Sequence, residues 1–490
     1  MNKEEPKEEQ TKETFIEGSS PFIEINDKKR LVIFITLVLV GTLSSCDGGI
    51  IPQQNDNIKN DFGGEGEVRV GLFGSIDYIG RVVGAIIFTL IMGKYNRKMM
   101  LVITLLFKAL TLFPPLINIE DNKDSYYYLN ITARCLSGVS QVFYPTYLPV
   151  WCDQYAKKNH KAIWVTLVQI GNPIGIILGY GLGLLCEAFA PEKGWRYAFP
   201  IEGICLIVLA VIILMFNNLF FSEKFILIED SKGKEKTLTD KDTEVSLFGN
   251  LGKIICNKIF LFSSLCNSVA FFGIGVVQFY GNKYMEKVLD INEGIRFILF
   301  GFLCLFGPTT GMVCGGIICS KLGGYVKKSS MTFVIICMAI SSIISMFIAF
   351  HDLTILFVIT GWSYLFSIGA SIPPISGIII SCLDNDLRGD GFSFCNLIIN
   401  LIGSFPSSYV YSLLADAFEY KGETVKLQYA WMFSMAYNFV GLIFVIIAGI
   451  FRFRIKGDLS ENKSDKESNS ENTKTETGGE NNNGEKYQNI

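Results

Sequence analysis

The chain has 490 residues, of which half are hydrophobic and only 18% are charged, and its mean hydropathy is +0.36. A soluble domain carries roughly a quarter charged residues, so this composition excludes an ordinary soluble domain. The formal net charge of −3 gives no sign of a nucleic-acid partner, and none is expected.

Long apolar segments follow one another along the chain in two sets of six, and a polar stretch separates the sets. Each segment has about the 20 apolar residues that a helix needs to cross a bilayer. The pattern predicts an all-α integral membrane protein with twelve transmembrane helices in two six-helix bundles. The expected spans are 31–53, 69–92, 99–118, 129–151, 162–186, 197–221, 259–281, 296–320, 330–350, 354–380, 391–415 and 429–451.

These spans divide the chain into five segments. The first residues are too polar for the core of a secretory signal peptide, so the first helix is expected to be its own anchor. The tail after the last span is rich in Asn, Glu, Ser, Lys and Gly and is expected to be disordered. The segments are a disordered N-terminal tail (1–30), a first bundle (31–221), a linker (222–258), a second bundle (259–451) and a disordered C-terminal tail (452–490).

The distribution of Lys and Arg predicts the orientation, because cytoplasmic loops hold an excess of them. Both termini and the linker are expected in the cytoplasm, of a plasma membrane or of an internal organelle. A glycosylation sequon begins at Asn130, but it abuts the fourth span, and whether it is used is left open. The basic residues all lie on one side of twelve spans and include Lys28, Lys29, Arg30, Lys94, Arg97, Lys98, Lys321, Lys327, Lys328, Arg452 and Arg454.

Four charged residues inside the first bundle are the main candidates for function: Asp47, Asp77, Arg81 and Arg134. Ionisable groups inside a bilayer are costly unless they face a partner or a cavity. Asp77 and Arg81 are four residues apart on one helix and can form a structural ion pair. Alternatively, the four side chains form a polar network at a gate or substrate cavity and exchange partners during transport.

In the second bundle the polar candidates are neutral: Asn267, Gln278, Asn396 and Asn400. They hydrogen-bond either a substrate or the next helix. Aromatic residues, among them Tyr144 and Tyr280, would suit an apolar tail in the cavity or serve only in packing. With these amides they make up the expected lining of a substrate cavity.

Several short motifs resemble those of the major facilitator superfamily. Arg134 with Gly138 is similar to the family's Arg-x-x-x-Gly motif, and the glycines around Pro173 are similar to its glycine-rich fifth helix. Within that superfamily the first half is most similar to the spinster-type transporters, through Asp47 and the run from Tyr95 to Lys98. The resemblance implies two bundles that rock about a central site.

The chain departs from that pattern at several positions. Lys94, Arg97 and Lys98 belong to the expected cytoplasmic gating loop, but Gly93 stands where the family has an acidic residue. Gly48 stands where spinster-type proteins have an arginine after the helix 1 aspartate. Gln141 replaces the helix 4 glutamate of the resemblance and cannot accept a proton, so Asp47 or Asp77 would carry the proton if transport is proton-coupled.

The expected function is secondary active transport of a small organic solute by alternating access, with the lipid bilayer and that solute as partners. A lysolipid or other amphiphile is one substrate class; a sugar, amino acid, organic anion or drug is the alternative. A transport-inactive receptor or scaffold on the same fold is a further alternative. No enzyme activity, cofactor or metal is expected, because the sequence has no nucleotide-binding loop and only two histidines, His160 and His351.

Overall fold

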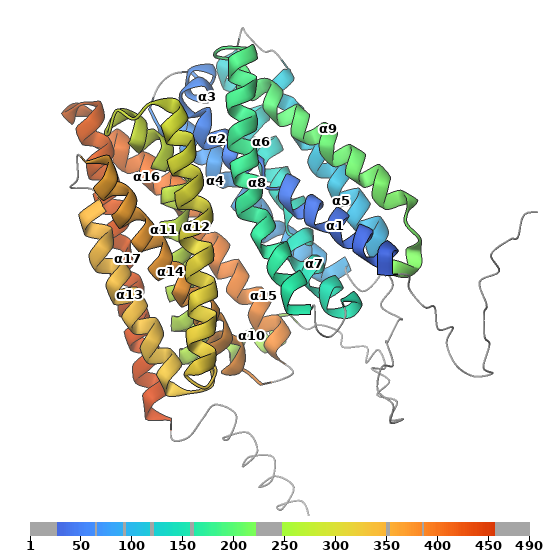
Figure 1. Ribbon diagram of the computed structural model, residues 1–490, viewed down its shortest axis with the longest axis vertical. Helices are drawn as coiled ribbons and strands as arrows, with labels where there is room; N and C mark the ends of the chain where they lie inside the picture. The colour runs from blue at the N-terminus through green and yellow to red at the C-terminus, as the bar shows by residue number, and fades with distance from the viewer. Residues whose placement is uncertain are drawn as a thin grey trace, which may run out of the picture.

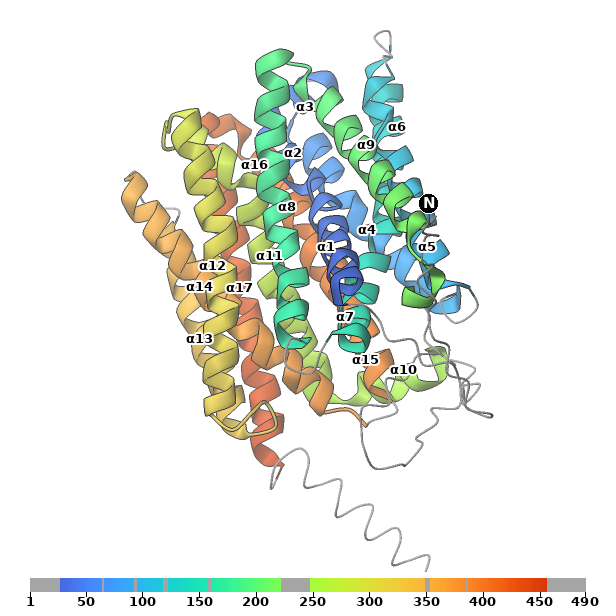
Figure 2. The same cartoon turned by 45° about the vertical axis from the view of Figure 1, so that its right-hand side comes forward.

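The computed structural model describes residues 27–63, 66–91, 95–117, 122–156, 161–221, 247–348, 353–384 and 387–455. All regular structure in these ranges is helical. The helices form two bundles that lie side by side, the first coloured blue to green and the second yellow to red (Figures 1 and 2).

The first bundle comprises α1 (Asp27–Leu43), α2 (Asp47–Gln53), α3 (Asn55–Asp61), α4 (Val68–Ile91), α5 (Arg97–Thr111), η1 (Pro114–Leu116), α6 (Lys123–Gln141), α7 (Phe143–Tyr155), α8 (Lys161–Phe189), α9 (Gly194–Met215) and η2 (Asn218–Phe221). The second comprises α10 (Leu247–Cys256), α11 (Lys258–Lys287), α12 (Glu293–Lys321), α13 (Lys328–Ile348), α14 (Thr354–Ser381), α15 (Arg388–Ile398), η4 (Ile399–Ser404), α16 (Phe405–Ala417), η5 (Glu419–Lys421) and α17 (Glu423–Arg454). α10 lies in the expected linker, and its Ile254 is buried in the second bundle's core.

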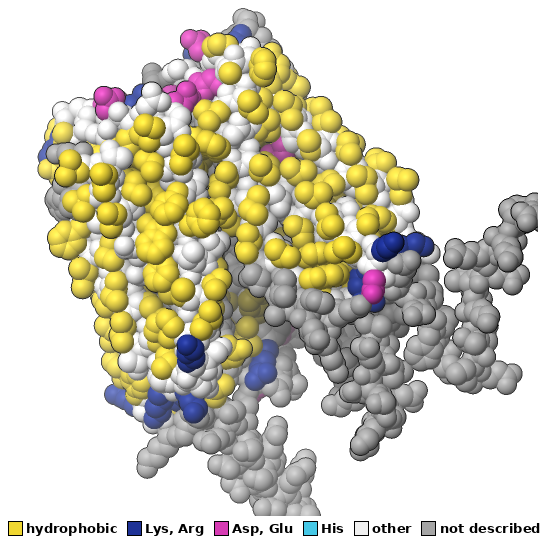
Figure 3. Space-filling model, in the orientation of Figure 1, with side chains coloured by type: hydrophobic (Ala, Val, Ile, Leu, Met, Phe, Trp, Pro, Cys, Tyr) yellow, Lys and Arg dark blue, Asp and Glu magenta, His cyan; other side chains and the backbone are white. Residues whose placement is uncertain are grey.

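The two ends of the molecule differ in charge. We call the end where α1 begins and α17 finishes the termini side, and the opposite end, where α3 lies, the α3 side (Figure 1). On the face seen in Figure 3, basic side chains gather on the termini side and acidic side chains on the α3 side, with an apolar belt between them. This is the surface of a protein that crosses a membrane.

Eleven helices of the described residues are long and apolar enough to span a membrane. The remaining expected span, 129–151, corresponds to α6 and α7, which meet at Val142. Pro145 has no N–H to donate to the carbonyl of Gln141, so the helix ladder is interrupted at that residue. The expected eleventh span is interrupted as well, by the π-helical segment η4, which ends two residues before Pro406.

The expected first span is also broken, between α1 and α2, at residues 44–46. The hydroxyls of Ser44 and Ser45 donate to the carbonyl of Gly41 and compete with the backbone ladder. The N–H of Gly48 bonds Ser45 O and Asp47 Oδ1, which leaves the carbonyl of Ser44 free for side chains. The break therefore creates an acceptor next to Asp47, inside the bundle.

The glycine-rich face of α8 covers this break. A Cβ atom at Gly179 would overlap the carbonyl oxygen of Cys46, and one at Gly175 would overlap that of Thr42. Only glycine lets the two backbones approach so closely. The close packing of α8 holds the α1–α2 break, and with it Asp47, in place.

Candidate functional site

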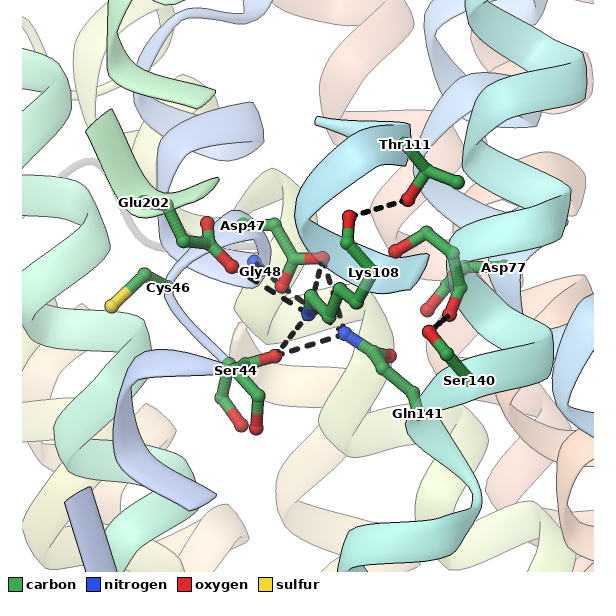
Figure 4. Close-up of polar contacts among 12 residues, drawn as sticks. Ser44, Cys46, Asp47, Gly48, Asp77, Lys108, Thr111, Ser140, Gln141 and Glu202 are labelled. Carbon is green, nitrogen blue, oxygen red and sulfur yellow. Dashed lines mark hydrogen bonds and ion pairs between the residues drawn. The ribbon is translucent and has the colours of Figure 1, made fainter. Parts of the chain in front are cut away.

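Asp47 is at the centre of a buried polar network in the first bundle (Figure 4). Its side chain is only 3% exposed, and Oδ2 accepts hydrogen bonds from Arg134 Nη1, from Lys108 Nζ at 3.2 Å and from Gln141 Nε2 at 3.1 Å. Gly138, one turn beyond Arg134, packs on the backbone of Asp77, so the motif Arg134-x-x-x-Gly138 brings α6 directly against α4. Because Asp47 lies in the first expected span and Arg134 in the fourth, these two spans meet at the Asp47–Arg134 ion pair.

Lys108 of α5 and Glu202 of α9 extend the network, and the sequence analysis missed both. Lys108 is fully buried, donates to the carbonyl of Ser44, and lies 3.5 Å from Glu202 Oε1. The two oxygens of Glu202 accept no hydrogen bond within the described residues. Both residues lie inside expected spans, where any charged residue is a functional candidate, so that signal could have found them.

Gln141 joins the Asp47 pair to a second ion pair. Its Oε1 accepts from Arg81 Nη2 at 2.6 Å, while its Nε2 donates to Asp47 and to Ser44 O at 2.9 Å. The same Nη2 of Arg81 bonds Asp77 Oδ2 at 2.9 Å. An amide can do this because it has both donors and an acceptor, whereas an ionised carboxylate only accepts.

The network is balanced in charge when all its groups are ionised. It contains three carboxylates and three cations, namely Asp47, Asp77 and Glu202 with Arg81, Lys108 and Arg134. Buried ions are tolerated when each has a partner, and removal of one partner is strongly destabilising. The arrangement therefore resists the loss of a single charge.

A second polar cluster joins the two bundles on the α3 side. Lys283 of α11 donates to Asp56 Oδ1 and Glu67 Oε1, both at 2.8 Å, and to Asn55 Oδ1 at 3.1 Å. Asp416 of α16 accepts from the backbone N–H of Glu67 at 2.6 Å and caps the first turn of α4. We call Asn55, Asp56, Glu67, Lys283 and Asp416 the α3-side latch.

Two carboxyls of the latch, Asp56 and Glu67, are held in their charged form. Burial alone would raise the pKa of Asp56, but Lys283 and Lys287 outweigh it and bring that pKa to about 2. The pKa of Glu67 is also lowered, since Lys283 and Lys59 outweigh its burial. Lys283 is a charged exception to the neutral polar residues expected in the second bundle. It lies beyond the expected span 259–281, but α11 continues to Lys287.

Residues 33–408 match the profile of the Major Facilitator Superfamily. The chain belongs to this superfamily. It is a multi-pass membrane transporter with the twelve-helix architecture that the sequence predicts, and that prediction is confirmed.

We refer to this chain as the facilitator, after its superfamily. Among curated proteins, it is 22% identical to the sphingosine-1-phosphate transporter SPNS2 of Danio rerio, over 78% of this chain and 75% of that protein. It is also 22% identical to the "Probable sphingolipid transporter spinster homolog 2" of Arabidopsis thaliana, over 60% of each chain. These relatives confirm the resemblance to spinster-type transporters, and they are transporters, not enzymes.

Solved structures give the same fold. A bacterial homologue of the human lysosomal transporter Spinster, in an inward-facing and occupied conformation, superimposes with a TM-score of 0.63 at 14% identity, covering 87% of this chain and 97% of the homologue. A D-xylose–proton symporter superimposes with a TM-score of 0.65 at 13% identity, covering 88% of this chain and 98% of the symporter.

The structure of the facilitator separates the expected cavity residues into two groups. Gln278, Asn396 and Asn400 are half-buried, and Gln278 Nε2 lies 3.5 Å from where a Cβ of Gly48 would be. Asn400 donates to the carbonyl of Asn396, one turn earlier on its own chain segment. Asn267 is buried in α11, and its Oδ1 has no hydrogen-bond partner within the described residues.

Tyr144 and Tyr280, two of the expected cavity residues, are both buried. Tyr144 is 2% exposed in the core of the first bundle, and Tyr280 is fully buried and stacks on Tyr411 at 3.9 Å between ring centroids. In the described residues their aromatic rings therefore take part in packing, which is the alternative that the sequence left open.

The expected gating loop is described in part. Lys94 and Gly93 lie outside the described residues. Lys98 donates to the carbonyls of Leu214 and Phe216, so it caps the end of α9 within its own bundle. The guanidinium of Arg97 lies 6.0 Å from the centre of the Tyr147 ring. In the described residues Lys98 thus has a capping role that the sequence analysis did not foresee.

Proposed function

We propose that the facilitator moves a single-tailed amphiphile with a polar headgroup between the two sides of the membrane by alternating access. The observation that carries this proposal is the mixed character of the α11 face toward the first bundle. Asn282 donates to Pro52 O and Gln278 lies beside Gly48, so this face points at the other bundle. One and two turns toward the termini side, the same face presents half-buried Ile274 and Phe271.

A polar level and an apolar level therefore follow one another along α11. Gln278 belongs to the polar level and lies beside Gly48, next to Asp47 of the buried network, whereas Ile274 and Phe271 form the apolar level. An amphiphile would place its headgroup at the first and its tail at the second. The sphingosine-1-phosphate and sphingolipid transporters among the relatives support this substrate class.

The latch indicates from which side of the membrane a substrate can enter between the bundles in this state. It joins the bundles on the α3 side, where α8 and α12 also meet: Gly301 of α12 lies against Ile177 of α8. In the view of Figure 1, α8 and α12 lie farther apart toward the termini side. We propose that substrate enters from the termini side in this state, and that the latch opens when the other side becomes accessible.

The orientation proposed is that the termini side faces the cytoplasm, with both termini there. The basic residues of the described loops, among them Lys321, Lys327 and Lys328, support it. Proton coupling, if transport has it, is assigned to carboxyl groups of the buried network and not to Gln141, which has no titratable proton.

Uptake into reconstituted vesicles tests the proposal. Vesicles with the facilitator should take up labelled sphingosine-1-phosphate or lysophosphatidylcholine faster than empty vesicles, and should not take up labelled xylose. Asp47→Asn and Arg134→Ala should each slow uptake in protein that remains folded; unchanged rates in both would remove the network from the mechanism. Movement of xylose but no lipid would favour the sugar alternative, and movement of neither would favour a scaffold.

A further inference from the structure

We infer that Arg81 receives the anionic group of the transported molecule, so that the preferred amphiphile is one with a phosphate or carboxylate headgroup. This inference rests on the proposed amphiphile transport. Of the six charged side chains in the network, Arg81 is 32% exposed, whereas the other five are at most 5% exposed. It is the one charge that a molecule outside the network can reach.

The helical face of α4 places Arg81 toward the space between the bundles. A Cβ atom at Gly71 would overlap Ser412 of the second bundle, and one at Gly74 would overlap Phe279. Positions three and four residues apart share a helix face, so the stripe from 71 and 74 continues through Tyr78 to Arg81. Tyr78 and Arg81 are half-buried, in contrast to Asp77 on the neighbouring face, which is 2% exposed.

The guanidinium of Arg81 has donors left over. Within the described residues both of its hydrogen bonds run from Nη2, to Asp77 and to Gln141, and its Nε has no partner. An arginine has five N–H donors in a planar fork, so the Nη1 amino group remains for a second anion. The ring of Tyr78 lies 4.6 Å from the guanidinium carbon and restrains it.

The surroundings of Arg81 favour the binding of an anionic headgroup over that of a cationic one. The half-buried polar residues of the second bundle include Gln278, Asn396 and Asn400, whose amides can donate hydrogen bonds to a headgroup, and η4, which contains Asn400, packs against α4. Asp77 already shares Arg81, so the preference for an anion is expected to be moderate, about tenfold.

A matched pair of lipids tests the assignment. Oleoyl lysophosphatidic acid and mono-oleoylglycerol have the same tail and differ in the phosphate. Binding of each to the purified full-length protein is measured by thermal shift over a concentration series. Wild type should bind the phosphate-bearing lipid about tenfold more tightly.

The variants separate a headgroup site from a structural ion pair. Arg81→Gln should abolish the preference, measured as the ratio of the two affinities within each protein, whereas Asp77→Asn should increase that ratio because Arg81 is no longer shared. If Arg81→Gln does not fold, Asp77→Asn with Arg81→Gln removes both charges and should show the same loss. Two results would overturn the assignment. One is a preference that survives Arg81→Gln, and the other is an equal loss of affinity for both lipids in both single variants.

Two further outcomes distinguish this inference from the proposed function. If vesicles move both lipids equally and Arg81→Gln changes nothing, the Arg81 assignment fails while amphiphile transport stands. If vesicles move neither lipid but the protein still prefers the phosphate through Arg81, the proposed function fails and the anion site stands. Equal stabilisation by glycerol 3-phosphate would keep the anion site but contradict an amphiphile as its ligand.

Discussion

At the scale of single residues, the buried network depends on an amide at position 141. Gln141 accepts from Arg81 and donates to Asp47, so it connects a cation to a carboxylate with the correct polarity on each side. A glutamate would satisfy Arg81 but would place a second carboxylate against Asp47. A glutamine in place of the family's glutamate therefore suits both neighbours, because it accepts from Arg81 and donates to Asp47.

Gln141→Glu should therefore destabilise the protein by about 3 kcal/mol at pH 8, because an extra buried charge has no partner of its own. At pH 5 the deficit should shrink, since a protonated glutamate can again donate to Asp47. Thermal unfolding in detergent at both pH values measures this. Gln141→Met, which has no titratable group, is the control; a deficit in Gln141→Glu that is equal at pH 5 and pH 8 would contradict the bridging role.

Part of this network could be predicted from the sequence. Asp47, Arg134, Asp77 and Arg81 are charges in apolar spans, and the structure joins their two ion pairs through Gln141; that they exchange partners during transport stays a prediction. Which further charges join them depends on how the helices rotate and pack, which hydropathy does not report. For the same reason, Tyr144 and Tyr280 could not be assigned to packing from the sequence.

At the scale of elements, the positions of the functional candidates depend more on where the membrane-spanning helices are interrupted than on the spans themselves. The apolar segments predict where helices cross the membrane, because that depends on average hydropathy. The break between α1 and α2 lies inside such a segment and leaves its hydropathy high, so the pattern does not reveal it. The α8 glycines were visible in the sequence, but the surface they contact was not.

Gly179→Ala should destabilise the protein by about 3 kcal/mol, because the new methyl group overlaps the Cys46 carbonyl and forces α8 away from the break. Gly316→Ala in α12 is the matched control: nothing lies within 4 Å of the position of its Cβ, and its thermal midpoint should be unchanged or slightly higher. Equal midpoints for the two variants would contradict the role given to α8.

The latch gives a prediction for pH. Asp56 has a pKa of about 2 in the folded protein against 3.8 in the unpaired group, so its stabilisation is full above about pH 5 and is lost as the pH falls from about 4 to 2. The side chain is 43% exposed, so its contribution is about 1 kcal/mol after screening.

The thermal midpoint of Asp56→Asn should accordingly lie below that of wild type by the same amount at pH 8 and pH 5. The difference should narrow only below pH 4. If it narrows already between pH 7 and pH 5, Asp56 is not held in its charged form by Lys283.

At the scale of the whole molecule, the two bundles have different roles. The first contains the charge-balanced network, and the second supplies amides, apolar side chains and the latch cation Lys283. The sequence predicted two bundles because two sets of six spans are a linear pattern. It could not predict on which side the bundles meet, since that depends on contacts between residues more than 200 positions apart, as in the Lys283–Glu67 pair.

The central claim is that the α3 side must open during transport, and a cross-link between the bundles tests it most directly. Ile177→Cys and Gly301→Cys place a cysteine pair where α8 meets α12 on the α3 side, with each single variant as a control for the native cysteines. Oxidation of the double variant should stop uptake of labelled sphingosine-1-phosphate into vesicles, and reduction should restore it, while neither single variant responds. Uptake at the wild-type rate by protein shown to be fully cross-linked would contradict alternating access through this side.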